Sequence, residues 1–128
     1  MPKLPWTRSS ETDDNQPCVV MASYLPLARR SAIPSFVGAT MAIRRQLRTA
    51  PGLLGYSLDA DLLHGQFWTL SAWVDRSSLD AFAQAEPHRS RIARIRPSMR
   101  PTKFVFWEAT GRQLPISWKD ARQRLDAG

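Results

Sequence analysis

A chain of 128 residues with 43% hydrophobic and 23% charged residues has the size and composition of one globular domain. No apolar run approaches the ~20 residues of a membrane-spanning helix, and residues 1–16 lack the apolar segment of a signal peptide, so we expect a cytoplasmic protein. The lone Cys18 excludes a disulfide within the chain and a cysteine-based metal site. The net charge of +7 comes from dispersed arginines without a nucleic-acid-binding motif, which favours a solvated basic surface over specific nucleic-acid binding.

The first part of the chain predicts an arm, a strand and a helix. Residues 1–17 are polar and contain prolines, which is typical of a flexible N-terminal arm. β-branched and apolar residues predict a strand over 18–25. Apolar residues at three- and four-residue steps then predict a helix that begins near Pro34 and ends before the turn at Pro51–Gly52.

The second part of the chain alternates apolar strands with short amphipathic helices. Asp75 is a typical N-cap residue, and Pro87 is suited to the start of the next helix. The expected elements are strands over 53–60 and 66–74, helices over 76–85 and 87–96, a strand over 102–110, and a short helix over 116–125.

This order predicts a ferredoxin-like βαββαβ fold of the α+β class, with an antiparallel four-stranded sheet over residues 18–110 and a C-terminal tail over 111–128. In such a fold the helices cover one face of the sheet. Aromatic and apolar residues alternate onto both faces of the strands at 66–74 and 102–110. Because the helix-free face also needs to be covered, we expect a homodimer whose sheets pack face to face, as in a dimeric α+β barrel.

His88 is the main candidate for chemistry. On a helix that begins near Pro87, His88 shares an apolar face with Ile92 and Ile95 and lies at the helix N-terminus. Apolar burial and the positive end of the helix both favour a neutral imidazole, which a general base, a substrate-orienting group or a haem-iron ligand requires. The plainer alternative is a half-buried structural histidine, while His64, in a polar turn, is expected on the surface.

Aromatic residues between helices and sheet suit a flat apolar ligand, although ordinary core packing explains them as well. The candidate ligand-binding aromatics are Tyr56, Trp73 and Phe82. Arg44, beside the apolar stripe of the first helix, is a candidate partner for an acidic group of the ligand, or else a surface arginine. The sequence has no phosphate-binding loop, no GxSxG motif, no HExxH motif and no metal-ligand cluster, so hydrolase, kinase and metal-dependent chemistries are not indicated.

The stretch FWTLSAWVDRSSLDAFAQAEPHRSRI resembles the antibiotic-biosynthesis-monooxygenase-like family of dimeric α+β barrels. In that family a strand ending in Trp or Tyr leads into an acidic turn, a short helix with an aromatic residue, and a PH pair that opens the next helix. Trp73, Asp75, Phe82 and Pro87–His88 match this pattern in order. APGLLGYSL also looks like the family's passage from the first helix to the second strand, and the likeness spans about residues 18–110.

The resemblance implies a cofactor-independent monooxygenase acting on a polyphenolic or polyketide-like substrate in a pocket between helices and sheet. His88 would be its base or orienting group, and Tyr56, Trp73 and Phe82 would shape the pocket. The haem-degrading relatives use an Asn, a Trp and a His, and this chain departs from that triad. The alternative is a non-catalytic small-ligand or haem-binding protein of the same fold, in which His88 would be the iron ligand. A membrane partner and a specific nucleic-acid partner are not expected.

Overall fold

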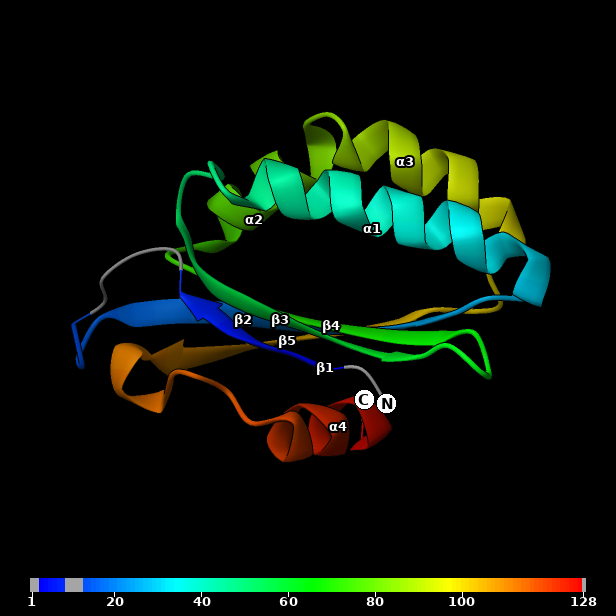
Figure 1. The fold of residues 1–128 in the computed structure, drawn as a ribbon. Coiled ribbons are helices and arrows are strands. Elements are labelled where there is room, and N and C mark those ends of the chain that lie inside the picture. Colours follow the sequence, from blue (N-terminus) through cyan, green and yellow to red (C-terminus); the bar gives the residue numbers. More distant parts are fainter. Residues whose placement is uncertain (1–2, 9–12, 128) are drawn as a thin grey trace.

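The computed structural model describes residues 3–8 and 13–127, which form one antiparallel sheet with helices on both of its faces (Figure 1). The predicted N-terminal arm falls partly outside these residues. The strands are β1 (Lys3–Arg8), β2 (Pro17–Pro26), β3 (Leu53–Asp61), β4 (Gln66–Trp73) and β5 (Lys103–Thr110). The helices are α1 (Ile33–Leu47), α2 (Arg76–Gln84), α3 (His88–Ile95) and α4 (Trp118–Ala127).

The predicted α+β class and antiparallel pairing are confirmed. The sheet order is β1-β3-β4-β2-β5, in which β2 to β5 and helices α1 to α3 form the βαββαβ unit. Helices α1, α2 and α3 lie together over one face of the sheet (Figure 1). None of the helices within the described part of the chain has the length and apolar character to cross a membrane.

Two local signals place the start of α2 against the turn that follows α1. Asp75 accepts a hydrogen bond from the Ser78 backbone N–H at 2.8 Å, which confirms it as the N-cap. Gly52 has a φ of 82°, and a Cβ on it would lie 2.3 Å from Ser78 Oγ. The turn between α1 and β3 therefore requires glycine for both its backbone conformation and its close approach to α2.

The prediction of four strands is wrong, because a fifth strand, β1, pairs antiparallel with β3 at the edge of the sheet. Its register shifts between Leu4 and Thr7, and Pro5 lies within it, so the sequence lacks the strict alternation of a regular strand. Trp6 packs on Gly55, where a Cβ would lie 2.4 Å from the indole nitrogen. The absence of a side chain at Gly55 therefore provides the space in which Trp6 docks.

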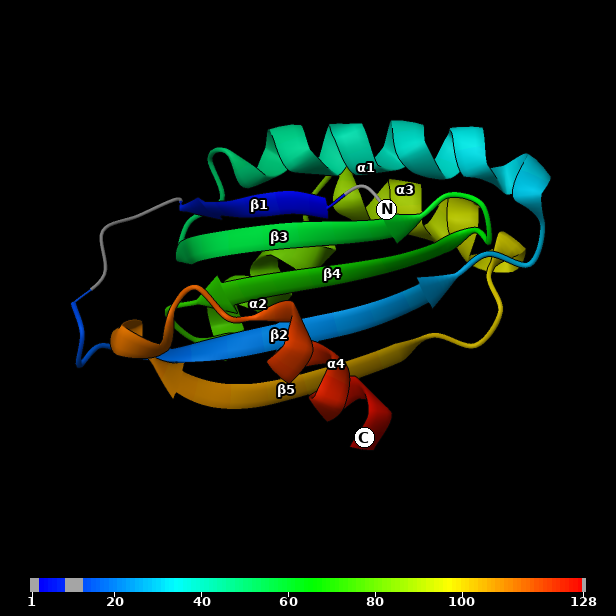
Figure 2. The ribbon, with the colours of Figure 1, turned by 60° about the horizontal axis from the view of Figure 1, so that its bottom comes forward.

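Helix α4 lies on the face of the sheet opposite α1 to α3 (Figures 1 and 2). Ala121 and Leu125 of α4 are buried there, together with Ile116 just before the helix. The strand residues in the same cluster are Cys18, Val20, Ala22, Leu54, Leu70, Ala72 and Ala109. The sequence predicts a homodimer because this face would otherwise be uncovered. Since α4 covers it, a second copy is not needed for that purpose, and the dimer stays a prediction.

Helix α4 crosses β2 and β5 (Figure 2), and its polar side chains reach across to β3 and β4. The Trp118 indole N–H donates to Ser57 Oγ at 3.1 Å. Arg122 donates to Asp59 Oδ2, and its guanidinium lies 3.9 Å above the centre of the Trp68 ring. These contacts orient α4 on the sheet, in addition to the apolar packing beneath it.

The outer strand β5 is covered on the α4 face only. The side chains of Phe104 and Phe106 point to the other face and are 52% and 41% exposed. They are exposed in the single chain because the apolar clusters beneath α1, α2 and α3 include strand residues of β2, β3 and β4 and none of β5. Arg76 of α2 covers part of Phe106, with its guanidinium carbon 3.9 Å from the ring centre.

Replacing Leu125 with alanine is expected to lower the free energy of unfolding by about 2–4 kcal/mol, because it opens a cavity between α4 and the sheet. Leu125 is 4% exposed, whereas Leu63, in the β3–β4 turn, is 68% exposed and provides a matched control. Leu63→Ala should change the free energy by less than about 0.5 kcal/mol. Urea denaturation followed by tryptophan fluorescence measures both. Equal effects of the two substitutions would contradict the packing of α4 on the sheet.

Candidate functional site

Three of the predicted pocket residues come together between the sheet and α2. Tyr56 of β3, Trp73 of β4 and Phe82 of α2 belong to one apolar cluster, and the ring centres of Trp73 and Phe82 are 5.3 Å apart. The indole N–H of Trp73 donates to Ser71 Oγ at 2.9 Å, so its one donor already has a partner. Tyr56 and Trp73 are buried and contribute to the core, and their role in ligand binding stays a prediction.

His88 stands at the start of α3, half-buried beside Phe82, with the two ring centres 5.3 Å apart. Its backbone N–H donates to Gln46 Oε1 at 3.0 Å, and the Gln46 side-chain amide donates to the Phe82 carbonyl at 3.2 Å. Gln46 of α1 therefore connects the end of α2 to the start of α3. This connection holds the histidine against the aromatic ring.

The hydrogen bonds of His88 define the protonation of its ring. Nδ1 lies 3.0 Å from the Ala83 carbonyl oxygen. Because a carbonyl only accepts, Nδ1 carries the proton of the neutral ring and Nε2 is left unprotonated. Nε2 has no hydrogen-bond partner among the described residues and is not sealed from solvent.

Burial lowers the pKa of His88 below its ordinary value of 6.5, and the hydrogen bond to the Ala83 carbonyl opposes that shift. The imidazole is therefore neutral at pH 7. A neutral ring with an open, unprotonated nitrogen is the state that a general base requires. The same state also suits a structural histidine, and the catalytic role of His88 stays a prediction.

Arg44 and His64 are not members of this aromatic cluster. Arg44 is half-buried on α1, and its buried Nε has no hydrogen-bond partner among the described residues. Its predicted contact with a ligand stays a prediction. His64 is exposed and lies beside Asp61, with 2.7 Å between Nδ1 and Oδ2, which confirms its predicted surface position.

A hollow of about 490 Å³ lies between the C-terminal end of α1 and α2. Its lining includes Gln46 and Phe82, the two residues that also contact His88. His88, Tyr56 and Trp73 do not line it. The hollow therefore adjoins the histidine through Phe82 and Gln46 without reaching it.

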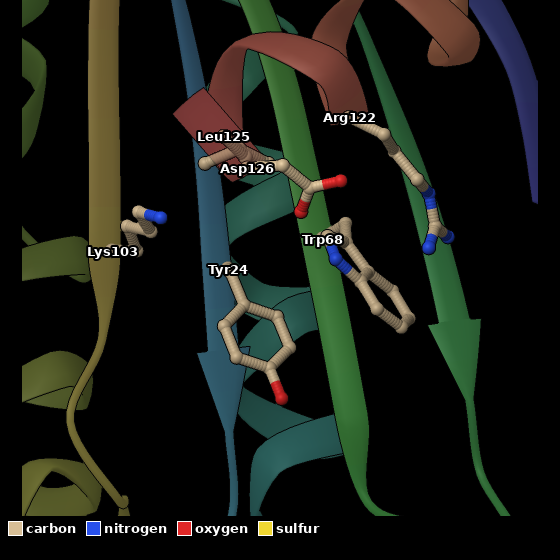
Figure 3. Close-up of a pocket in the computed structure, with 6 residues that line it drawn as sticks. All are labelled: Tyr24, Trp68, Lys103, Arg122, Leu125 and Asp126. Atoms are coloured by element: carbon tan, nitrogen blue, oxygen red, sulfur yellow. The ribbon is translucent and has the colours of Figure 1, made fainter. Parts of the chain in front are cut away.

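A second hollow, of about 330 Å³, lies on the opposite face of the sheet, beside α4 (Figure 3). It is lined by Tyr24, Trp68, Lys103, Arg122, Leu125 and Asp126. Sequence pattern alone does not indicate this site. Strand alternation places Trp68 on the face opposite Trp73, but local pattern does not reveal that α4 covers that face. Residues 3–8 and 13–127 contain no group of three His, Cys, Asp or Glu side chains able to hold a metal ion.

Comparison with solved structures shows an antibiotic-biosynthesis-monooxygenase-like fold. A structure named antibiotic biosynthesis monooxygenase superposes with a TM-score of 0.62 at 22% identity, covering 73% of this chain and 98% of that chain. A protein from Nitrosomonas europaea, provisionally named for the same family, gives a TM-score of 0.66 at 17% identity, covering 78% and 94%. Rv0793 from Mycobacterium tuberculosis gives 0.60 at 20% identity, covering 71% and 92%.

The sequence matches no protein-family model and no curated protein. The similar structures are covered almost completely, whereas about a quarter of this chain lies outside the alignments. This chain therefore adds segments to the shared fold. At these identities the likeness establishes the fold and leaves the chemistry to the site itself.

The lowered pKa of His88 predicts that stability depends on pH. The unfolded chain takes up a proton on this ring near pH 6.5, at a higher pH than the folded protein does. The free energy of unfolding should therefore rise with pH up to about 6.5 and gain nothing further from this group above it. Urea denaturation between about pH 5 and 8 should show this component in the wild type and in the His64→Gln control. His88→Gln should lack it, and parallel profiles for wild type and His88→Gln would contradict the burial of the imidazole.

Proposed function

We propose that this protein is a cofactor-independent monooxygenase acting on a flat, apolar substrate of the polyphenolic or polyketide type. The observation that carries the proposal is the state of His88: a neutral ring oriented by the Ala83 carbonyl and packed beside Phe82, with Nε2 unprotonated and without a hydrogen-bond partner among the described residues. The fold shared with proteins named antibiotic biosynthesis monooxygenases supports this class of chemistry over others.

In this proposal His88 Nε2 accepts a proton from the substrate, either from a phenolic hydroxyl or from a ring carbon made acidic by a neighbouring carbonyl. The anion that remains reduces O₂ directly, so the substrate supplies all the electrons. When a ring CH₂ group becomes C=O, one oxygen atom enters the product and the other leaves as water with the two hydrogens. The lowered pKa of His88 favours return of its proton to the departing oxygen.

The hollow between α1 and α2 is the proposed entrance for the substrate. Phe82 forms a wall shared by this hollow and His88, while Tyr56 and Trp73 lie in the same cluster beneath it. His88 does not line the hollow, so in this proposal a turn of the Phe82 ring brings the substrate from the hollow to Nε2. Arg44 of α1 stays the proposed partner for an acidic group of the substrate, through the outer nitrogens of its guanidinium, because its Nε is buried.

A non-catalytic haem- or small-ligand-binding function is the second candidate. The observation that favours it is the same open Nε2, because iron-ligating histidines commonly donate their other ring N–H to a carbonyl. The donor atom therefore fits haem iron. The space around His88 suits haem less well, because His88 lines neither hollow. A haem bound to Nε2 would also have to displace the neighbouring Phe82 ring.

Oxygen uptake with anthrone and with polyphenols, without added metal or flavin, tests the oxygenase. We expect His88→Gln to lower kcat by about 10²–10⁴-fold, because it removes the base. His64→Gln should retain the wild-type rate and serve as the control. Absence of uptake by the wild type, combined with a stoichiometric Soret band on hemin titration that His88→Gln abolishes, would instead establish the haem-binding alternative.

We also propose a homodimer in which α4 stays on its own sheet. β5 is an edge strand whose outer edge pairs with no other described strand, and its exposed Phe104 and Phe106 are apolar. Pairing with β5 of a second copy would satisfy the backbone groups of that edge and cover both rings.

Phe104→Glu is expected to convert a dimer into a monomer, because it places a charge in the proposed contact. Light scattering after size-exclusion chromatography measures the mass. Met41→Glu, at an exposed apolar position on α1, should leave the dimer intact and provides the control. A monomeric wild type, or a dimer that survives Phe104→Glu, would contradict this interface.

A further inference from the structure

Four residues in register cross the sheet on the face that α4 covers. Lys103 of β5 lies opposite Tyr24 of β2, Tyr24 lies opposite Trp68 of β4, and Trp68 lies opposite Asp59 of β3. Directly opposite residues of antiparallel strands point to the same face. They therefore form one row with an ammonium group at one end, two aromatic rings in the middle and a carboxylate at the other end.

The carboxylate end of this row is closed by α4. Asp59 is 2% exposed, and its charge is balanced by Arg122, which donates to Asp59 Oδ2. The same guanidinium lies over Trp68 at 3.9 Å from the ring centre. Arg122 therefore balances the charge of Asp59, and neither is a free charge in the hollow. The second carboxylate oxygen, Asp59 Oδ1, is buried and has no hydrogen-bond partner among the described residues.

The lysine end of the row is open. The Lys103 ammonium, the Tyr24 hydroxyl and the Trp68 indole N–H have no hydrogen bond or ion pair with any described residue, and all three residues line the 330 Å³ hollow (Figure 3). The rings of Tyr24 and Trp68 are 5.5 Å apart and tilted by 35°, forming an aromatic wall. The hollow thus presents three hydrogen-bond donors without partners among the described residues. Its lining also includes the carboxylate of Asp126, an exposed residue near the end of α4.

We propose that this hollow binds a planar aromatic carboxylate, with its rings against Tyr24 and Trp68 and its carboxylate at Lys103. Adjacent strands lie about 4.8 Å apart, so the row from Lys103 to Trp68 extends about 10 Å, which matches a two-ring aromatic acid. The carboxylate receives a charge-assisted hydrogen bond from the ammonium group, and the rings supply apolar contact. A neutral aromatic molecule lacks the first interaction, and an aliphatic acid lacks the second.

This site is separate from the proposed oxygenase site. The sheet lies between them, because His88 and Phe82 belong to the α1–α3 side and Tyr24 and Trp68 to the α4 side. Binding of an aromatic acid here does not involve His88 chemistry. The two sites can therefore be tested independently.

Isothermal titration calorimetry with 2-naphthoate tests the proposal, with 2-naphthamide as the uncharged probe of the same shape. We expect 2-naphthoate to bind in a 1:1 ratio and Lys103→Gln to weaken it by about tenfold or more, because the charged partner is lost. Lys103→Arg keeps the charge and should retain most of the affinity. Lys119→Gln, at an exposed lysine of α4, is the matched control and should bind as the wild type does.

Binding should also be unchanged in His88→Gln, which separates this site from the oxygenase site. Thermal unfolding of each variant without ligand checks that Lys103→Gln folds, and Lys103→Arg preserves the test if it does not. Equal affinity of wild type and Lys103→Gln for 2-naphthoate, equal affinity of the wild type for naphthoate and naphthamide, or loss of binding in His88→Gln would each overturn the proposal.

Discussion

The sheet is apolar on both faces, and water has to be excluded from each of them. Helices α1 to α3 cover one face and α4 covers the other, so the molecule has three layers rather than two (Figure 1). Small side chains on the strands, among them Ala22 and Ala72, let α4 approach closely, and Ala121 of α4 is fully buried against them. Removing this apolar area from water stabilises the fold at roughly 25 cal/mol per Å². The position of α4 in turn determines which polar groups meet beside it.

Most of the fold could be predicted from the sequence because it follows from local signals. Hydrophobic periodicity located the strands and helices from β2 to α4, and Asp75 marked the start of α2. The placement of α4 could not be predicted in this way. A helix with an apolar stripe around Ala121 and Leu125 fits any apolar face, and sequence pattern does not distinguish a face covered by the chain's own tail from one covered by a second copy. The irregular β1 lacked alternation altogether.

In the candidate site, too, local sequence signals predict some features, while others depend on tertiary packing. The position of His88 on the apolar face of a helix start followed from spacing alone. Its hydrogen bonds to Ala83 and Gln46 did not, because the contact with Gln46 joins residues 42 positions apart and depends on how α1 lies against α3. Likewise, alternation placed Trp68 opposite Trp73 in β4, but its neighbours Tyr24 and Lys103 follow only from the cross-strand register.

The two faces of β4 give the two sides of the molecule different chemistry. Trp73 faces a cluster of aliphatic and aromatic side chains that leads to Phe82 and a neutral histidine, whereas Trp68 faces the guanidinium of Arg122 and a row that ends in Lys103. A shift of β4 by one residue would exchange these faces, placing Trp68 under α2 and Trp73 under α4. The indole N–H of Trp73 donates a hydrogen bond to Ser71 on its side of the sheet. Trp68 lines the hollow on the other side, and its indole N–H has no partner among the described residues. The register of β4 is therefore fixed from both faces at once, and the core and the two proposed binding sites depend on the same register.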